Sequence, residues 1–539
     1  MQVHTCYPIA VETVAVTLTR RYAWITSADD ATYAKLEDFW SYQAPGSRYA
    51  PSFKVWLRNK AIARREGDPY REVYGWDGKI KLLKNGKLPA GLFRATKLEA
   101  AKKLSVGFDV TYDRPAIPPF EKGFDEASDL YQFQNDCVEA MCKAMRRGGG
   151  VVLSATGTGK TKASAQFFSK LSCPVLFIVD RIDLLYQSQQ EMAHWLGEPV
   201  GIVGDSEFAP ERVTIGTIQT LSLHAKKSAF KKWFATIKVL LVDELHKAMG
   251  KRNFKLLNQI KLIAIYGLTA TLQMGQKPVR YRVYAFSGPV IFRFPVKEGM
   301  EKGVLTKGRV LQLLFPALED EARDPAIAYV EETVDHTTKL LAARRIVDSL
   351  IDQDRYVMVL VDRVAHVKAL DEILHDIPHE IAYGAIAQKK RKRDRDRFEL
   401  GKIRCLVANR VYEKGINLKR VDVGIDLAEL PSPNDCVQKF GRMARLHEDK
   451  ANFLYVDFGT YGPSRRSKAA SARARAFRKE GMEVKVVKLD VERKYQASMA
   501  QKIVDKEIQK DELIRVRPTQ QSFEGFGATQ TRRTGSRGR

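Results

Sequence analysis

A glycine-rich segment and a pair of adjacent carboxylates are the side chains of this sequence best suited to chemistry. Residues 154–161 read Ser-Ala-Thr-Gly-Thr-Gly-Lys-Thr and follow the apolar run Val151–Leu153. A strand that opens into such a loop can hold phosphates with its backbone N–H groups at the start of a helix. Lys160 would then reach the β- and γ-phosphates of a nucleotide, and the hydroxyl of Thr161 would bind Mg²⁺. The predicted phosphate-binding residues are Gly157, Thr158, Gly159, Lys160 and Thr161.

The carboxylates follow a second apolar run. Asp243 and Glu244 come directly after Val239–Val242, which is typical of a buried strand. At that strand end, Asp243 would hold the Mg²⁺ shell and Glu244 would polarise the attacking water. A glycine-rich turn can also be a tight turn without a ligand, but the matched acidic strand end argues against that interpretation. Together the two segments predict an enzyme that binds and hydrolyses ATP with Mg²⁺.

A third candidate is the sequence Gln-Lys-Phe-Gly-Arg-Met-Ala-Arg at 438–445. Arg442 and Arg445 are three residues apart, a spacing that places them on one face of a helix. If that face lines a cleft opposite the glycine-rich loop, both can reach the γ-phosphate and neutralise charge that develops during transfer. A solvated basic helix is the alternative. Gly415 lies upstream in a turn, where the backbone would approach the nucleotide closely.

These residues need a scaffold of buried strands. Strand-like runs alternate with helical stretches between residues 125 and 295, and the pattern restarts after Gly303. This is the βαβ order of a parallel sheet. Besides Val151–Leu153, the predicted strands include Val175–Val179, Val213–Gly216, Val239–Val242, Ile263–Leu268, Tyr356–Val361, Ile403–Ala408, Val423–Asp426 and Phe453–Asp457.

The predicted fold class is therefore α/β, with two tandem parallel-sheet domains. A small α+β domain precedes them, after which Pro115–Pro119 reads as a linker. A charged segment follows them and ends in a basic, disordered tail, Arg-Arg-Thr-Gly-Ser-Arg-Gly-Arg. The predicted domains are 1–120, 121–300, 301–480 and 481–539, the last a charged extension that is partly disordered.

The composition indicates a large protein with a polyanionic partner. Among 539 residues, 90 Lys and Arg face 64 Asp and Glu, for a net charge of +26. Such an excess favours nucleic acid over a membrane surface, since no amphipathic basic helix dominates the sequence. No apolar run is long enough to cross a bilayer, and the N-terminus does not read as a signal peptide. The six cysteines include no CxxC pair, and the nine histidines show no metal-ligand spacing. We therefore expect a cytoplasmic protein with reduced thiols.

Eight segments in family order resemble the motifs of superfamily 2 helicases of the DExH type, over roughly residues 125–460. They are Asp129–Gln134, Ser154–Thr161, Val179–Gln187, Thr217–Thr220, Asp243–His246, Leu268–Thr271, Val361–Val364 and Val407–Asn417, followed by the arginine segment. The resemblance implies two RecA-like domains, ATP and Mg²⁺ as cofactors, and adenine recognition by Gln134, with Gln132 as the second choice. It implies that His246 links the two domains through hydrogen bonds rather than binding metal. Asn409 and Asn417 depart from the family pattern, where threonine and aspartate are common.

The N-terminal region supplies the remaining clue to the substrate. Residues 76–88 contain two hairpin signals, Asp77–Gly78 and Asn85–Gly86, which predict a small β-meander with a lysine-faced middle strand and a helix from Thr96 to Leu104. Beside Trp56, Tyr70, Tyr74 and Trp76, such a sheet could hold a nucleic-acid backbone. A scaffold that only braces the rest of the protein is the alternative.

This block ahead of a DExH motor resembles bacteriophage UvsW-like helicases, which remodel branched DNA such as replication forks and recombination intermediates. That resemblance implies forked or branched DNA as partner, with single-strand-binding or recombination proteins as further candidates and a host-cytoplasmic location if phage-encoded.

Three other functions remain open at this point. An RNA helicase would use the same motor, and a translocating subunit of a restriction system would need a partner nuclease, because no endonuclease carboxylate–lysine cluster is evident. An ATP-gated nucleic-acid-binding scaffold would bind without multiple turnover. The basic stretches Lys389–Arg397 and Arg465–Lys479 suit either a solvated helix face or a DNA contact. The sequence predicts neither the oligomeric state nor the direction of translocation.

Overall fold

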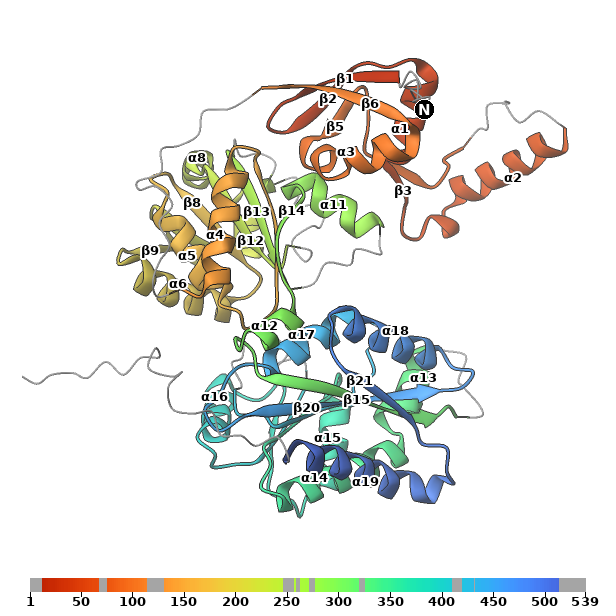
Figure 1. The fold of residues 1–539 in the computed structure, drawn as a ribbon, viewed down its shortest axis with the longest axis vertical. Helices are drawn as coiled ribbons and strands as arrows, with labels where there is room; N and C mark the ends of the chain where they lie inside the picture. The colour runs from red at the N-terminus through yellow and green to blue at the C-terminus, as the bar shows by residue number, and fades with distance from the viewer. Residues whose placement is uncertain are drawn as a thin grey trace, which may run out of the picture.

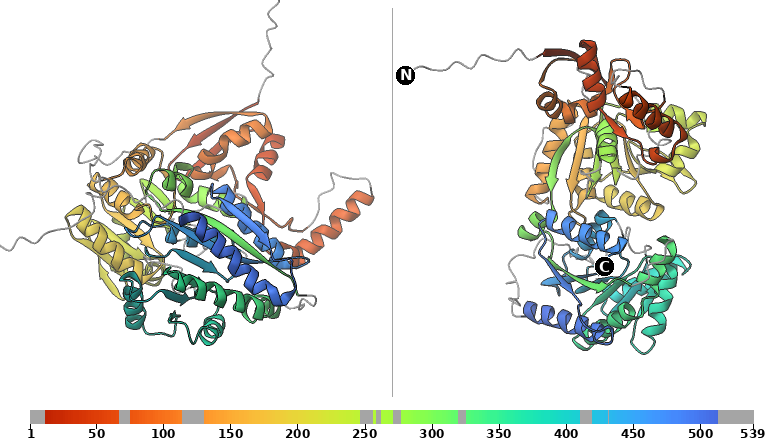
Figure 2. Two further views of the ribbon diagram at one scale, coloured as in Figure 1. Left: turned by 60° about the horizontal axis from the view of Figure 1, so that its bottom comes forward. Right: turned by 90° about the vertical axis from the view of Figure 1, so that its right-hand side faces the viewer.

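The computed structural model places the described residues in three successive parts along its long axis (Figure 1). The described ranges are 12–66, 75–113, 130–245, 256–257, 262–270, 277–318, 325–409, 419–430 and 432–512. The right view of Figure 2 shows the N-terminal part at one end and the part built from the C-terminal half at the other. Among the described helices, none is long and apolar enough to cross a membrane.

The N-terminal part is a small α+β unit. Its sheet has the order β5-β2-β1-β6, with β1 parallel to β6 and antiparallel to β2. The strands are β1 (Glu12–Leu18), β2 (Tyr22–Ser27), β3 (Ser41–Gln43), β4 (Lys79–Lys81), β5 (Lys87–Pro89) and β6 (Val106–Tyr112). The helices are α1 (Asp30–Phe39), the 3-10 turn η1 (Ser47–Tyr49), α2 (Pro51–Arg65) and α3 (Ala90–Leu104).

The predicted lysine-faced meander is wrong, although its second turn, Asn85–Gly86, does form between Lys84 and Lys87, which pair in an antiparallel bridge. β4 pairs with β3, whereas β5 pairs with β2 in a different sheet. Lys79 forms an ion pair with Asp38, and the Nζ of Lys81 lies 2.5 Å from a carboxylate oxygen of Glu37, both on α1. Carboxylates distant in sequence therefore neutralise this strand, and the hairpin signals could not reveal them. The helix predicted from Thr96 begins earlier, at Ala90, and ends at Leu104 as expected.

The first large sheet has eight strands in the order β10-β9-β11-β8-β12-β13-β7-β14. Every pair is parallel except the edge pair β10–β9. The strands are β7 (Gly149–Ser154), β8 (Val175–Val179), β9 (Val200–Gly204), β10 (Glu207–Ala209), β11 (Val213–Thr217), β12 (Val239–Asp243), β13 (Ala264–Thr269) and β14 (Val290–Phe294). The helices are α4 (Gln132–Met145), α5 (Lys160–Ser169), α6 (Ile182–Leu196), α7 (Ile218–His224), α8 (Ser228–Thr236), α11 (Lys277–Ser287) and α12 (Val296–Glu301).

Neighbouring residues of each strand in this sheet serve opposite faces. Val152 and Phe177 pack into a cluster with α4 and α5, while Val151 and Ile178 pack into a cluster with α7, α8 and α11. Burial on both faces explains why these strands are continuous apolar runs that could be predicted from the sequence.

The second large sheet has seven strands, all in parallel pairs, in the order β17-β18-β16-β19-β20-β15-β21. They are β15 (Lys307–Pro316), β16 (Val357–Leu360), β17 (Glu380–Ala382), β18 (Cys405–Ala408), β19 (Val423–Asp426), β20 (Asn452–Tyr461) and β21 (Val484–Lys488). The helices are α13 (Pro325–Tyr329), the π-helix η2 (Val330–Val334), α14 (Thr337–Asp352), α15 (Val364–Ile373), α16 (Gln388–Glu399), α17 (Pro433–Met443), α18 (Arg465–Lys479) and α19 (Arg493–Glu512). The α/β fold class with two parallel-sheet domains is thereby confirmed.

Part of the predicted charged extension contributes to the second sheet. Of residues 481–539, those up to 512 are described; they form β21, which pairs with β15, and α19, which packs on α14. The seam of α19 is apolar and buried, as its members Ala497, Ala500, Val504 and Ile508 show. The high charge of this helix concealed that seam in the sequence.

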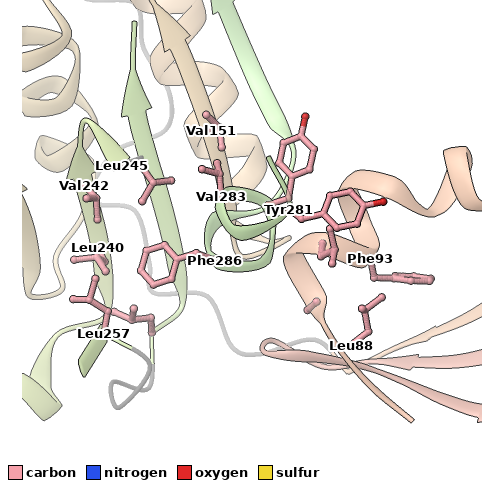
Figure 3. Close-up of a cluster of buried hydrophobic side chains, with 14 of the residues drawn as sticks. Leu88, Phe93, Val151, Leu240, Val242, Leu245, Leu257, Tyr281, Val283 and Phe286 are labelled. Atoms are coloured by element: carbon pink, nitrogen blue, oxygen red, sulfur yellow. The ribbon is translucent and has the colours of Figure 1, made fainter. Parts of the chain in front are cut away.

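The N-terminal unit and the first large sheet share one hydrophobic core. Leu88 and Phe93 of the N-terminal unit belong to the same cluster as Val283 and Phe286 of α11 and Leu240 of β12 (Figure 3). The close packing of α3 on α11 also requires Gly91, where an added Cβ would lie 2.2 Å from the carbonyl oxygen of Tyr284. The N-terminal unit is therefore firmly attached to the first sheet.

Candidate active site

The glycine-rich loop connects the end of β7 to the start of α5. Gly157 and Gly159 both adopt positive φ angles, 88° and 73°, which glycine tolerates without the steric penalty of a side chain. A Cβ on Gly159 would lie 2.4 Å from Nε2 of Gln134, and one on Gly157 would lie 3.0 Å from Cγ of Arg445. The loop is therefore enclosed from two sides, and its backbone leads directly into the first turn of α5, where Lys160 and Thr161 lie.

Lys160 is directed back onto its own loop. Its Nζ donates to the carbonyl oxygens of Ser154 and Ala155, at 3.1 and 3.2 Å. Burial lowers the pKa of Lys160, and Asp243 and Glu244 oppose that shift. The lysine of the loop and the two carboxylates thus lie within electrostatic range of each other.

Asp243 is the last residue of β12 and Glu244 follows it, so both lie at the predicted strand end. Burial, followed by the neighbouring charge of Glu244, raises the pKa of Asp243 to about 6, while Lys160 opposes the increase. A divalent cation at this carboxylate would favour its charged form, because metal ligands bind deprotonated. Glu244 has a positive φ of 47°, an uncommon conformation for a residue with a side chain.

The side chain of Glu244 bridges to two further elements. Its Oε2 accepts from the hydroxyl of Thr269, at the end of β13, and from Nε2 of Gln438 on α17, both at 3.4 Å. α17, which carries Gln438, is one of the helices of the second α/β part. Glu244 therefore lies where the first and second α/β parts meet.

The two arginines approach the loop from that second part. α17 ends at Met443, so that Arg442 lies in its last turn and Arg445 lies beyond its end. The prediction that both arginines lie on one helix face is wrong. Both nevertheless lower the pKa of Lys160, and the side chain of Arg445 packs against Gly157. Burial, followed by repulsion from Arg442, lowers the pKa of Arg445 to about 10.

Two residues that the sequence did not single out hold residues 443–445, at and just beyond the end of α17, in place. Thr306 donates its backbone N–H to the carbonyl of Ala444 at 2.6 Å and its hydroxyl to that of Arg445 at 3.1 Å. Lys450 donates its Nζ to the carbonyl of Met443 at 2.6 Å. These groups replace the helical hydrogen bonds that α17 lacks past its end. Neither residue carries a motif, so only the three-dimensional arrangement identifies them.

Gln134 and Gln132 occupy different environments. Gln134 is buried and donates its Nε2 to the carbonyl of Thr158 at 2.9 Å, while its Oε1 accepts from the backbone of Tyr131 at 3.1 Å. Gln132 is exposed and donates to Asp136 on its own helix. Of the two, Gln134 contacts the loop; adenine recognition by it stays a prediction.

Gly415, His246, Asn417, Tyr70 and Tyr74 lie outside the described residues.

The described part of the site fits a nucleoside triphosphate with Mg²⁺. Gly157 and Gly159 leave a backbone cradle that a Cβ would fill, and cationic side chains face it across from a carboxylate pair.

Comparison with known proteins agrees with this arrangement. Residues 127–274 match the family model for the type III restriction enzyme res subunit, and residues 338–447 match the helicase conserved C-terminal domain. The two matches fall on the two parts that meet at Glu244 and Gln438. The chain is a superfamily 2 helicase. It is accordingly an ATP-hydrolysing enzyme.

Relatives and solved structures span most of this helicase. It is 21% identical over 373 residues to the DNA 3'-5' translocase XPB2 of Sulfurisphaera tokodaii, over 62% of this chain and 82% of that protein. It is 24% identical over 464 residues to the ATP-dependent DNA helicase uvsW of Enterobacteria phage T4, over 78% and 86% of the two chains. A solved structure of the type ISP restriction-modification enzyme LlaBIII bound to DNA shares the fold, with a TM-score of 0.51 and 16% identity over 71% of this chain and 33% of that chain.

Proposed function

We propose that this helicase uses Mg²⁺ and ATP to translocate on DNA and to unwind, branch-migrate or anneal branched DNA during replication, recombination or repair. The observation that carries the proposal is the contact of Glu244 with Gln438, together with the packing of Arg445 on Gly157. Both join the glycine-rich loop's domain to the second domain. A nucleotide held there would make the relative position of the two domains depend on hydrolysis.

Each candidate residue has a distinct role in this proposal. Lys160 neutralises the β- and γ-phosphates, Thr161 and Asp243 hold the cation, and Glu244 orients the attacking water. Arg442 and Arg445 stabilise the charge that develops on the transferred phosphoryl group. The cation itself would supply further charge neutralisation at the phosphates. Because the arginines come from the other domain, efficient hydrolysis requires the two domains to be closed.

A helix N-terminus follows β8 in the first domain and β16 in the second. Arg181 is the N-cap residue of α6, and Arg363 is the N-cap residue of α15. The N-terminus of a helix attracts phosphate through its unpaired N–H groups and its dipole. With one such terminus in each domain, a nucleic-acid strand would have two separate binding points. Stepwise movement along that strand requires both.

DNA is the proposed substrate for two reasons. The relatives XPB2 and uvsW are named as acting on DNA, and the net charge of +26 suits a polyanion. Preference for branched DNA rests on the similarity to uvsW, which extends over 78% of this chain and thus includes more than the two helicase modules. RNA remains the competing substrate, because the motor segments do not distinguish the two.

The direct test is ATP hydrolysis by the full chain with a DNA fork, a matched RNA fork, single-stranded DNA or no nucleic acid. We expect the DNA fork to stimulate most, and we expect Lys160→Ala and Glu244→Gln to abolish stimulation. Lys502→Ala, on an exposed surface of α19, is the control and should behave as wild type. Undiminished hydrolysis in both site variants would overturn the site assignment, and stronger stimulation by the RNA fork would overturn the choice of DNA.

A second candidate function is the translocating subunit of a restriction system. The family model that matches residues 127–274 is that of a restriction-enzyme res subunit, which favours this candidate. It requires a nuclease partner. Co-purification of a nuclease with the chain, and DNA cleavage that depends on ATP, would favour it over the branched-DNA helicase.

A further inference from the structure

Helix α2 is the least enclosed helix of the N-terminal unit. It projects away from the body of the molecule in Figure 1, and the left view of Figure 2 shows the same projection. Its sequence, Pro-Ser-Phe-Lys-Val-Trp-Leu-Arg-Asn-Lys-Ala-Ile-Ala-Arg-Arg, contains five basic residues and no acidic residue. It therefore concentrates positive charge at a distance from the ATP site.

The two faces of α2 differ in what they contact. The inner face carries Phe53 and Trp56, whose rings stack with centroids 5.7 Å apart. A Cβ on Gly75 would lie 3.0 Å from Cβ of Trp56, and one on Gly78 would lie 2.8 Å from the ring of Phe53. The aromatic side chains thus pack on the turn that follows the helix in the chain. They anchor the helix, so that their aromatic surface is not available for a ligand.

The outer face carries the charge. Lys54, Arg58 and Arg65 follow one another at spacings of four and seven residues, which places them in one row along a helix. All three are exposed. Among the described residues, none forms an ion pair with them, in contrast to Lys79 and Lys81, which pair with α1. We call these three residues the α2 ridge.

Apolar side chains border the α2 ridge. Val55 and Leu57 are 46% and 47% exposed, and Ile62 is 39% exposed. On a helix these positions lie on either side of the ridge. A row of cations with apolar borders suits contact with a charged backbone and the groove beside it, since groove walls offer apolar as well as polar surface.

The base of α2 is fixed to the first helicase domain. Lys277 and Tyr281 of α11 donate to the carbonyl of Phe39, the last residue of α1 and two residues before β3, at 2.9 and 3.2 Å. Gln43 at the end of β3 donates to Ser47 at 2.8 Å, in the turn that precedes α2. The α2 ridge is therefore held at a defined position relative to the domain that carries Lys160.

We propose that the α2 ridge is a binding surface for the phosphate backbone of duplex DNA that flanks the strand in the motor. This inference rests on the proposed DNA helicase function. The 15 residues of α2 extend for about 22 Å at roughly 1.5 Å per residue, along which a duplex presents about one phosphate charge per 1.7 Å. A helix that projects from the body can lie along a straight duplex. Duplex DNA also has about twice the linear charge of a single strand.

The test compares two charge reversals in the full chain. Lys54→Glu with Arg58→Glu changes the α2 ridge. Lys502→Glu with Lys506→Glu makes the same charge change at the same spacing on α19, at the opposite end of the molecule, where both lysines are exposed. Binding to a labelled blunt duplex, a fork and single-stranded DNA is measured by fluorescence anisotropy over a series of salt concentrations, with ATP hydrolysis on saturating single-stranded DNA as a second readout.

We expect the α2 variant to bind duplex and fork roughly tenfold more weakly, with a salt slope smaller by about two, because each phosphate contact contributes close to one unit. Its binding to single-stranded DNA and its hydrolysis on saturating single strand should equal wild type. The α19 variant should equal wild type throughout. A neutral pair, Lys54→Gln with Arg58→Gln, should give an intermediate loss, which separates lost contacts from introduced repulsion.

Other outcomes would overturn the inference. An equal loss in both charge-reversed variants would show an effect of net charge alone, and unchanged duplex binding in the α2 variant would exclude the ridge. Loss of binding to phosphatidylserine vesicles with intact duplex binding would assign the ridge to a membrane surface instead. The failure of the proposed function looks different: wild type would then show no stimulation of hydrolysis by any DNA, whatever the α2 variant does.

Discussion

The Nε2 of Gln438 lies 3.4 Å from the Oε2 of Glu244, and this contact joins the two helicase domains at the residue proposed to orient the attacking water. The same oxygen lies 3.4 Å from the hydroxyl of Thr269. The position of the carboxylate therefore depends on both domains. A change in the distance between the domains would change the geometry of hydrolysis.

Replacement of Gln438 tests this dependence. Gln438→Ala should lower kcat for DNA-stimulated ATP hydrolysis by roughly tenfold to a hundredfold, because one oriented donor near the reacting groups is lost. The dissociation constant for ATP should change little, since Lys160 and the loop are intact. Steady-state kinetics and nucleotide binding measure the two quantities. Gln501→Ala on α19 is the matched control, and an increase in KM with normal kcat would contradict the account.

Arg445 should be more sensitive to substitution than its charge alone suggests. Arg445→Ala should reduce kcat by about a thousandfold, within the usual effect of an arginine at a transferring phosphoryl group. Arg445→Lys should recover little, because an ammonium lacks the planar fork of a guanidinium. Single-turnover hydrolysis measures the effect on chemistry. Arg475→Ala, an exposed arginine of α18, serves as control; near-normal turnover by the lysine variant would argue for simple charge neutralisation.

The attachment of the N-terminal unit can be tested at Gly91. Its added Cβ would meet backbone atoms at 2.2 and 2.9 Å, so Gly91→Ala must force α3 away from α11. Overpacking of this kind lowers the free energy of unfolding by about 2 kcal/mol. Thermal unfolding and limited proteolysis between α3 and the first sheet check the effect. Gly107→Ala should be tolerated, as its nearest contact is a side-chain oxygen at 3.3 Å.

Lys450 provides a prediction for pH. Burial lowers the pKa of Lys450 from 10.5 to about 7, so between these values the unfolded chain binds a proton that the folded chain does not. The contribution of Lys450 to the free energy of unfolding must therefore rise with pH across that window, by up to about 1.4 kcal/mol per pH unit. Lys450→Met should remove the rise while it also removes the hydrogen bond to Met443 at every pH. Denaturant unfolding at several pH values measures the difference; parallel curves for wild type and variant would refute a buried neutral lysine.

Much of the fold could be predicted from the sequence because its central strands are buried on both faces. β8 and β19 have the predicted bounds, and the strand that leads into the glycine-rich loop is longer but in place. Two of the missed elements, α19 and β4, are only partly buried, whereas β9 and β15 were missed although most of their residues are buried. α19 hides its seam among charged residues, and the lysines of β4 find their partners on α1, far away in the sequence.

The candidate site also contains residues that could be identified from the sequence and residues whose place could not. Lys160, Thr161, Asp243 and Glu244 could be identified because loop and strand ends carry local signals. The place of Arg445 could not, since its segment is held by Thr306 and Lys450 after the helix has ended. The link from Gln438 to Glu244 joins residues of different domains, and no periodicity in the sequence predicts it.

ATP-dependent strand displacement on a DNA fork tests the central claim most directly, with wild type and Glu244→Gln compared at equal occupancy by ATP and DNA. The account predicts displacement by wild type only with ATP and Mg²⁺. It predicts that Glu244→Gln binds both ligands and displaces no strand. Displacement by Glu244→Gln at the wild-type rate, or a wild-type protein whose hydrolysis is stimulated by the fork without any displacement or annealing, would contradict it.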